Sequence, residues 1–130
     1  GVGASSIDQS IVVAYPGTWM TYPHIRITGP ITDCVITNET TGEKLDFDGV
    51  TIASGDYYDI DTRYGYKSVV DAAGENKIAD LAADSDLATF HLAPRRGGEA
   101  VRENAIRVQG KSSTAATRID LVFFARYLGI

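Results

Sequence analysis

The chain has 130 residues, of which 44% are hydrophobic and 22% are charged, and its net charge is −5. This length fits one domain that buries an apolar core without disulfides. The single cysteine, Cys34, excludes an intrachain disulfide and a cysteine-based metal cluster. No apolar run approaches the roughly 20 residues of a membrane span, and the acidic pI near 4.8 argues against nucleic-acid binding. We therefore expect a soluble domain.

The two ends of the chain differ in composition and charge. Residues 1–6 (GVGASS) have the composition of a linker or a remnant of processing, so we expect one domain over residues 7–130. Because the chain starts with Gly1 and its only methionine is Met20, we expect it to be a processed or excised piece of a longer protein. Residues 1–93 carry a net charge of −9 and residues 94–130 a net charge of +4. Either the basic strands lie beside acidic ones within one domain, or protomers associate head to tail.

Alternating apolar and polar residues predict strands through the first half of the chain. The expected strands are Ile7–Tyr15, Tyr22–Thr28, Asp33–Asn38, Lys44–Phe47 and Val50–Ala53. In the second of them, Ile25 and Ile27 share the face opposite His24 and Arg26. Asp48-Gly49 is a strong turn signal, so we expect it to join the last two strands as a hairpin.

The second half continues this pattern with one interruption. Strands are expected at Asp56–Asp61, Tyr66–Asp71, Leu87–Leu92, Ala105–Gln109 and Thr117–Tyr127, with a turn at residues 63–65. Tyr58 and Ile60 should point inward. Lys77–Ala83 has helix-forming residues but is long enough only for a short helical turn. The last strand is apolar on both faces, so we expect it to be central or covered.

These elements predict an all-β fold with nine or ten short strands and at most one short helical turn. Strands that recur about every ten residues favour an antiparallel β-sandwich. A closed barrel is the alternative, because periodicity does not distinguish the two.

Few residues suggest catalysis or metal binding. His24 and His91 lie in strand patterns, and no Gly-x-Ser-x-Gly segment is present. Carboxylates two residues apart occur at Asp46 with Asp48, Asp59 with Asp61, and Asp84 with Asp86, yet none has the further ligands of a calcium loop. Arg95-Arg96-Gly97-Gly98 lacks the ending of a phosphate loop. We therefore predict no metal, no cofactor and no enzymatic activity, and an enzyme working through Asp59 or Asp61 is the least favoured reading.

One group of residues has the chemistry of a glycan site. Tyr57, Asp59 and Asp61 share the outward face of one strand, and Tyr64 and Tyr66 follow in the next turn. Flat rings cover the apolar face of a sugar, while carboxylates accept its hydroxyl protons. The competing interpretation is that these tyrosines only fit a pleated, half-buried surface.

The order of short motifs along the chain resembles a known family. The motifs run from Tyr22 to Tyr127, and they are Tyr22–Pro30, Val35–Gly42 with Leu45, Ile52–Asp56, Ile60–Thr62, Asp84–Leu87 with Phe90, Leu92 and Pro94, Asn104–Val108, and Phe124–Tyr127. In this order and spacing they resemble the C-terminal domain of phage distal tail proteins, the siphovirus tail component family. The loop at Pro94–Glu103 and the segment Lys111–Ala116 depart from the family pattern.

The resemblance implies a galectin-like, jelly-roll type of β-sandwich that lies outside a homo-hexameric ring built by a separate N-terminal domain. It implies a structural virion protein at the tail tip or baseplate, made in the bacterial cytoplasm and not inserted in a membrane. The domain would be a non-catalytic docking module for other tail or receptor-binding proteins. A carbohydrate-binding module that helps attachment to a host-surface glycan is the alternative.

Overall fold

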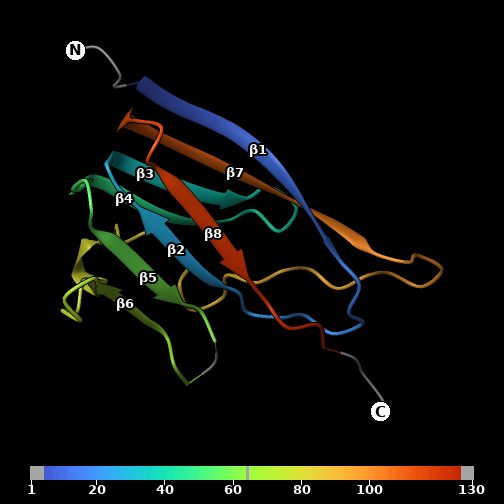
Figure 1. Cartoon of the computed structure of the whole chain (residues 1–130). Coiled ribbons are helices and arrows are strands. Elements are labelled where there is room, and N and C mark those ends of the chain that lie inside the picture. Colours follow the sequence, from blue (N-terminus) through green and yellow to red (C-terminus); the bar gives the residue numbers. More distant parts are fainter. Residues whose placement is uncertain (1–4, 64, 127–130) are drawn as a thin grey trace.

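The computed structural model describes residues 5–63 and 65–126, which form two four-stranded antiparallel sheets (Figure 1). The strands are β1 (Ser5–Tyr15), β2 (His24–Thr28), β3 (Ile31–Asn38), β4 (Glu43–Ile52), β5 (Tyr57–Asp61), β6 (Ser68–Asp71), β7 (Arg102–Ser113) and β8 (Arg118–Val122). The first sheet has the order β1-β7-β3-β4 and the second the order β6-β5-β2-β8. In the described residues the only helix is the 3-10 turn η1 (Ile78–Asp80). The prediction of an all-β antiparallel sandwich is confirmed, with eight strands where nine or ten were expected.

The core lies between the two sheets because each strand turns its apolar residues to the same side. Ile25 and Ile27 of β2, and Tyr58 and Ile60 of β5, are buried as the alternation predicts. From the first sheet they meet Ile36, Leu45, Phe47, Ile106 and Val108, all buried. The rings of Phe47 and Tyr58 meet edge to face, with centroids 5.7 Å apart. The outer faces of the two sheets carry mostly polar and aromatic side chains, together with exposed valines such as Val12 and Val122.

The predicted hairpin at Asp48-Gly49 is wrong. β4 runs unbroken through these residues, and both of its halves pair with β3, from Asn38 opposite Glu43 to Ile31 opposite Ile52. Gly49 uses its positive φ of 82° in a bulge, where its N–H donates a hydrogen bond of 2.7 Å to Asp33 Oδ1. Pairing with β3 lets β4 bury apolar side chains on both sides of the bulge, and this outweighs the local turn signal.

The predicted strand Leu87–Leu92 is also wrong. Among the described residues, its only ladder contact is an isolated bridge between Thr21 and Leu92. The backbone of this segment forms turn hydrogen bonds instead: the N–H groups of Thr89 and Phe90 both donate to Asp86 O. Phe90 and Leu92 are fully buried. The alternation of apolar and polar residues in this segment therefore reflects burial in the core and not pairing in a sheet.

β8 is an edge strand, which corrects the expectation of a central or covered position. Of the described strands it pairs only with β2, and it ends at Val122. Ile119, Leu121 and Phe123 pack against the core, whereas Val122 and Phe124 point outward with 55% and 78% exposure. The C-terminal end of the expected strand, Tyr127, lies outside the described residues.

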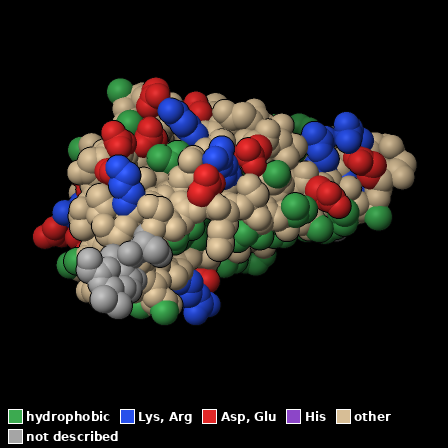
Figure 2. Space-filling view, turned by 90° about the horizontal axis from the view of Figure 1, so that it is seen from above, with side chains coloured by type: hydrophobic (Ala, Val, Ile, Leu, Met, Phe, Trp, Pro, Cys, Tyr) green, Lys and Arg blue, Asp and Glu red, His purple; other side chains and the backbone are tan. Residues whose placement is uncertain are grey.

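Charges of opposite sign from the two ends of the chain meet within the domain. β1 begins at Ser5, inside the segment 1–6 that was expected to be a linker. The Arg107 guanidinium on β7 lies 2.8 Å from the Asp8 carboxylate on β1, and Lys111 Nζ lies 3.3 Å from Asp33 Oδ2. Figure 2 shows basic and acidic side chains interspersed on one face. This pairing favours basic strands beside acidic ones within one domain.

Candidate functional site

The candidate site lies on the outer face of the second sheet, where β5, β2 and β8 run side by side. On this face, antiparallel pairing sets His24 of β2 opposite Asp61 of β5 and opposite Val122 of β8. It also sets Arg26 between Asp59 and Asp120. Three segments that are distant in sequence therefore share one surface.

Arg26 and Asp59 form the central ion pair of this face. The Arg26 guanidinium donates hydrogen bonds from Nε to Asp59 Oδ1 at 2.7 Å and from Nη2 to Asp59 Oδ2 at 3.0 Å. This bidentate bond raises the pKa of Arg26. The guanidinium also lies 4.0 Å from the centroid of the Tyr57 ring. Two of the predicted glycan-site residues, Tyr57 and Asp59, are thus held together by a shared cation.

Asp61 and Arg63 form a second pair at the end of β5. Arg63 donates a hydrogen bond from Nη2 to Asp61 Oδ2 at 2.7 Å, and its backbone N–H donates one to Asp61 Oδ1 at 3.0 Å. Burial alone would raise the pKa of Asp61, but these hydrogen bonds outweigh it and the pKa is lowered. The Arg63 guanidinium lies 4.7 Å from the centroid of the Tyr66 ring, which is 65% exposed. Tyr64, the remaining predicted residue, lies outside the described part of the chain.

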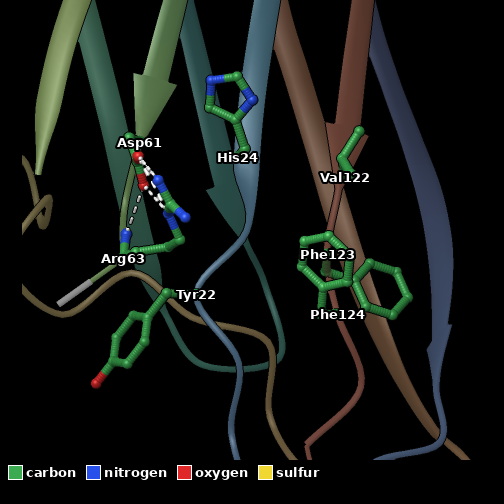
Figure 3. A pocket seen from close by; sticks show the side chains of 7 residues that line it. All are labelled: Tyr22, His24, Asp61, Arg63, Val122, Phe123 and Phe124. Atoms are coloured by element: carbon green, nitrogen blue, oxygen red, sulfur yellow. Dashed lines mark hydrogen bonds and ion pairs between the residues drawn. The ribbon is translucent and has the colours of Figure 1, made fainter. Parts of the chain in front are cut away.

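A hollow of about 230 Å³, which we call the first hollow, opens beside this pair (Figure 3). It is lined by Tyr22, His24, Asp61, Arg63, Val122, Phe123 and Phe124. In Figure 3, Asp61 and Arg63 face each other on one side, and the aromatic residues of the C-terminal segment stand on the other. The hollow therefore places an ion pair opposite apolar surface, which is the mixture expected of a site that orients a polar ligand.

A second hollow of about 340 Å³ shares Tyr22, Arg63 and Phe124 with the first. Its other lining residues are Thr21, Tyr66 and Arg126. The two hollows therefore adjoin at Tyr22, Arg63 and Phe124 and form a two-part depression.

Lys67 supports the Tyr22 side of this depression. Its ammonium lies 4.7 Å from the centroid of the Tyr22 ring and donates a hydrogen bond of 2.6 Å to Thr62 O. Desolvation by burial lowers the pKa of Lys67. One face of the Tyr22 ring is therefore already occupied by a cation.

Tyr22, His24 and Phe124 were not predicted as site residues. Tyr22 and His24 lie at the start of β2 or just before it, and Phe124 follows β8. The pairing of β2 with β5 and β8 brings these two segments to the predicted tyrosines and aspartates. The outward face of His24 was readable from strand alternation. Exposure of Phe124 was harder to predict, because the expected C-terminal strand had apolar residues on both faces and was therefore expected to be covered.

The other two carboxylate pairs lie away from this face, and Lys44 contacts one member of each. Its ammonium is 2.8 Å from Asp84 Oδ2 and 3.7 Å from Asp46 Oδ2. His91, the second histidine, has Nδ1 2.9 Å from Glu43 Oε1. Within the described residues, no group of three or more His, Cys, Asp or Glu side chains is placed to hold a metal ion.

Comparison of the chain with protein-family models, with curated proteins and with solved structures gave no match. Across residues 5–63 and 65–126, no helix is long and apolar enough to cross a membrane.

Proposed function

We propose that this domain is a non-catalytic docking module of a bacteriophage tail tip, which carries other tail or receptor-binding proteins outside a hexameric ring. Two things support the proposal. The motif order from Tyr22 to Tyr127 resembles the C-terminal domain of distal tail proteins, and the chain folds as a β-sandwich of the class that the resemblance implies.

The observation that carries the docking role is an exposed apolar cluster around the end of β8. Val122, Phe124 and Tyr66 are 55%, 78% and 65% exposed, and Phe124 and Tyr66 line the same hollow. Trp19, 40% exposed, is joined to this area by the bridge between Trp19 and Arg126. Clustered exposed apolar side chains are typical of surfaces that bind another protein.

The experiment is co-expression of this chain with each structural protein encoded beside it, followed by size-exclusion chromatography. Val122→Asp should abolish the complex, because it places a charge in the contact surface. Val12→Asp is the matched control, since Val12 is also an outward valine of an edge strand, 57% exposed, but belongs to the other sheet. If no neighbouring protein binds, or both variants bind alike, the docking proposal is wrong.

The second candidate function is glycan binding on the same outer face. It is favoured because each ion pair, Arg26 with Asp59 and Arg63 with Asp61, lies beside a tyrosine ring, that of Tyr57 or Tyr66. Ordered carboxylates and exposed rings are the groups that sugars use. Binding to isolated bacterial cell walls and to a glycan panel tests it. Saturable binding that Tyr66→Ala weakens would support the glycan function, and no binding to either material would exclude it.

A further inference from the structure

The lysines and arginines of this chain are not equally paired. All twelve lie in the described residues, and eight of them have a carboxylate within 4.0 Å. The four that have no such partner among the described residues are Lys67, Arg95, Arg102 and Arg126. Arg95 is satisfied by carbonyl groups, because its guanidinium donates to Pro16 O and Glu99 O. Of the others, Arg126 lines the second hollow, and Lys67 lies against Tyr22 at its wall.

The second hollow therefore has a positive lining in a protein whose net charge is −5. Arg63 and Arg126 are its only charged lining residues, and no carboxylate lines it within the described chain. Arg63 binds Asp61 through Nε and Nη2, which leaves the Nη1 edge of its guanidinium available as a donor. Arg126 is exposed, and its two hydrogen bonds with Tyr15 and Trp19 use only its backbone.

Phe124 supplies a flat apolar surface at the same place. It is 78% exposed, and no ring or cation covers it among the described residues. The Arg63 guanidinium lies over only one face of the Tyr66 ring. Stacking against one such ring suits a pyranose, and guanidinium groups bind carboxylate or phosphate oxygens in a bidentate geometry.

We propose that the second hollow binds a saccharide that carries an anionic group, either a carboxylate or a phosphate. The sugar ring lies against Phe124, and its anion is bound by Arg126 and by the free edge of Arg63. The hollow of about 340 Å³ is at the small end of ligand sites, so it holds one or two sugar units of a longer chain. This inference rests on the second candidate function, and it names the ligand class of that surface.

The test is an array of paired saccharides, on which uronic acids stand beside their methyl esters and sugar phosphates beside the dephosphorylated sugars. The best acidic ligand is then titrated by calorimetry at low and at high salt. We expect the acidic member of a pair to bind at least about tenfold more tightly than its neutral partner, because charge-assisted hydrogen bonds have no counterpart in the neutral form. The two kinds of acid on the array identify the anion.

Three variants locate the site. Arg126→Gln should remove most of the preference for the acid, and Phe124→Ala should weaken binding of acidic and neutral forms alike. Arg102→Gln is the matched control, because it also removes a cation that has no carboxylate within 4.0 Å in the described chain, but from another hollow. It should leave the affinity unchanged.

Several outcomes would overturn this proposal, and they differ from failure of the glycan function. Equal affinity for acidic and neutral partners, or a preference that Arg126→Gln leaves intact, would refute the anion site while glycan binding stood. Equally tight binding of tetraglutamate would show that the hollow recognises acidic peptides and not sugars. Retention of no saccharide at all would refute both the anion site and the glycan function.

Discussion

Asn104 of β7 is a buried amide whose removal should destabilise the fold far more than its size suggests. It has no exposed surface. Its Oδ1 accepts the N–H of Ala93 at 2.7 Å, and its Nδ2 donates to Ala93 O at 3.2 Å. A second buried amide, Asn38, donates to Asn104 Oδ1 at 3.2 Å. These bonds attach the irregular chain before residue 94 to the first sheet.

The expected loss follows from the groups that Asn104→Ala would leave unpaired. Both backbone groups of Ala93 lose a partner inside the protein, and an unsatisfied buried polar group costs about 1–3 kcal/mol. We expect a fall of roughly 2–4 kcal/mol in the free energy of unfolding. For a domain of this size that lowers Tm by roughly 10 °C.

Urea unfolding monitored by far-UV circular dichroism and by Trp19 fluorescence measures this loss. Asn76→Ala is the control, because the exposed Asn76 side chain accepts one bond of 3.0 Å from the Ile78 N–H at a turn. It should cost less than about 1 kcal/mol. If Asn104→Ala cost no more than Asn76→Ala, the buried amide would not hold the loop, and the reasoning would be refuted.

Three further predictions concern single positions. Burial raises the pKa of the Cys34 thiol to about 12, so Ellman's reagent at pH 8 should label it only in urea, and rapid labelling of the folded chain would contradict this. Because the folded pKa of Asp61 is below its ordinary value of 3.8, its contribution to stability is present above that pH and is lost as pH falls further. Asp61→Asn should therefore lower the urea midpoint more at pH 7 than at pH 2, and an equal effect at both would contradict the pairing. A Cβ on Gly110 would lie 2.5 Å from Ile31 Cδ1, so Gly110→Ala should cost about 1–3 kcal/mol in chemical denaturation, whereas Gly97→Ala, with open space around it, should change stability by less than about 0.5 kcal/mol.

The sequence determined which residues form the inner faces of the short strands. Ile25 with Ile27, and Tyr58 with Ile60, follow a period of two that only a half-buried strand satisfies, and all four are buried. The outward direction of Tyr57 and Asp59 follows from the same period. The antiparallel all-β class followed too, because many such strands separated by turns have few other ways to bury one face each. The choice between a sandwich and a closed barrel depended on strand pairing, which gives two separate sheets.

Where a local sequence signal for a turn or for burial competes with strand pairing, the tertiary structure decides which one prevails. Asp48-Gly49 has the residues of a hairpin turn, yet pairing of all of β4 with β3 converts the glycine into a bulge. The C-terminal strand was expected to be central or covered because Val122 and Phe124 are apolar on its outward side. β8 nevertheless lies at an edge, and Phe124, which follows it, is exposed, because no further strand pairs with β8 in the described chain. Neither outcome depends on the local residues alone.

One part of the candidate site could likewise be predicted from the sequence, and the other part depended on the tertiary structure. The predicted tyrosines and aspartates come from one hairpin, where neighbours in space are also near in sequence. Tyr22, Phe124 and Arg126 reach them only through the order β5-β2-β8, which joins segments about a hundred residues apart. Strand alternation fixes which face a side chain takes, but the neighbours across that face depend on strand order and register, and these are set by burial over the whole core.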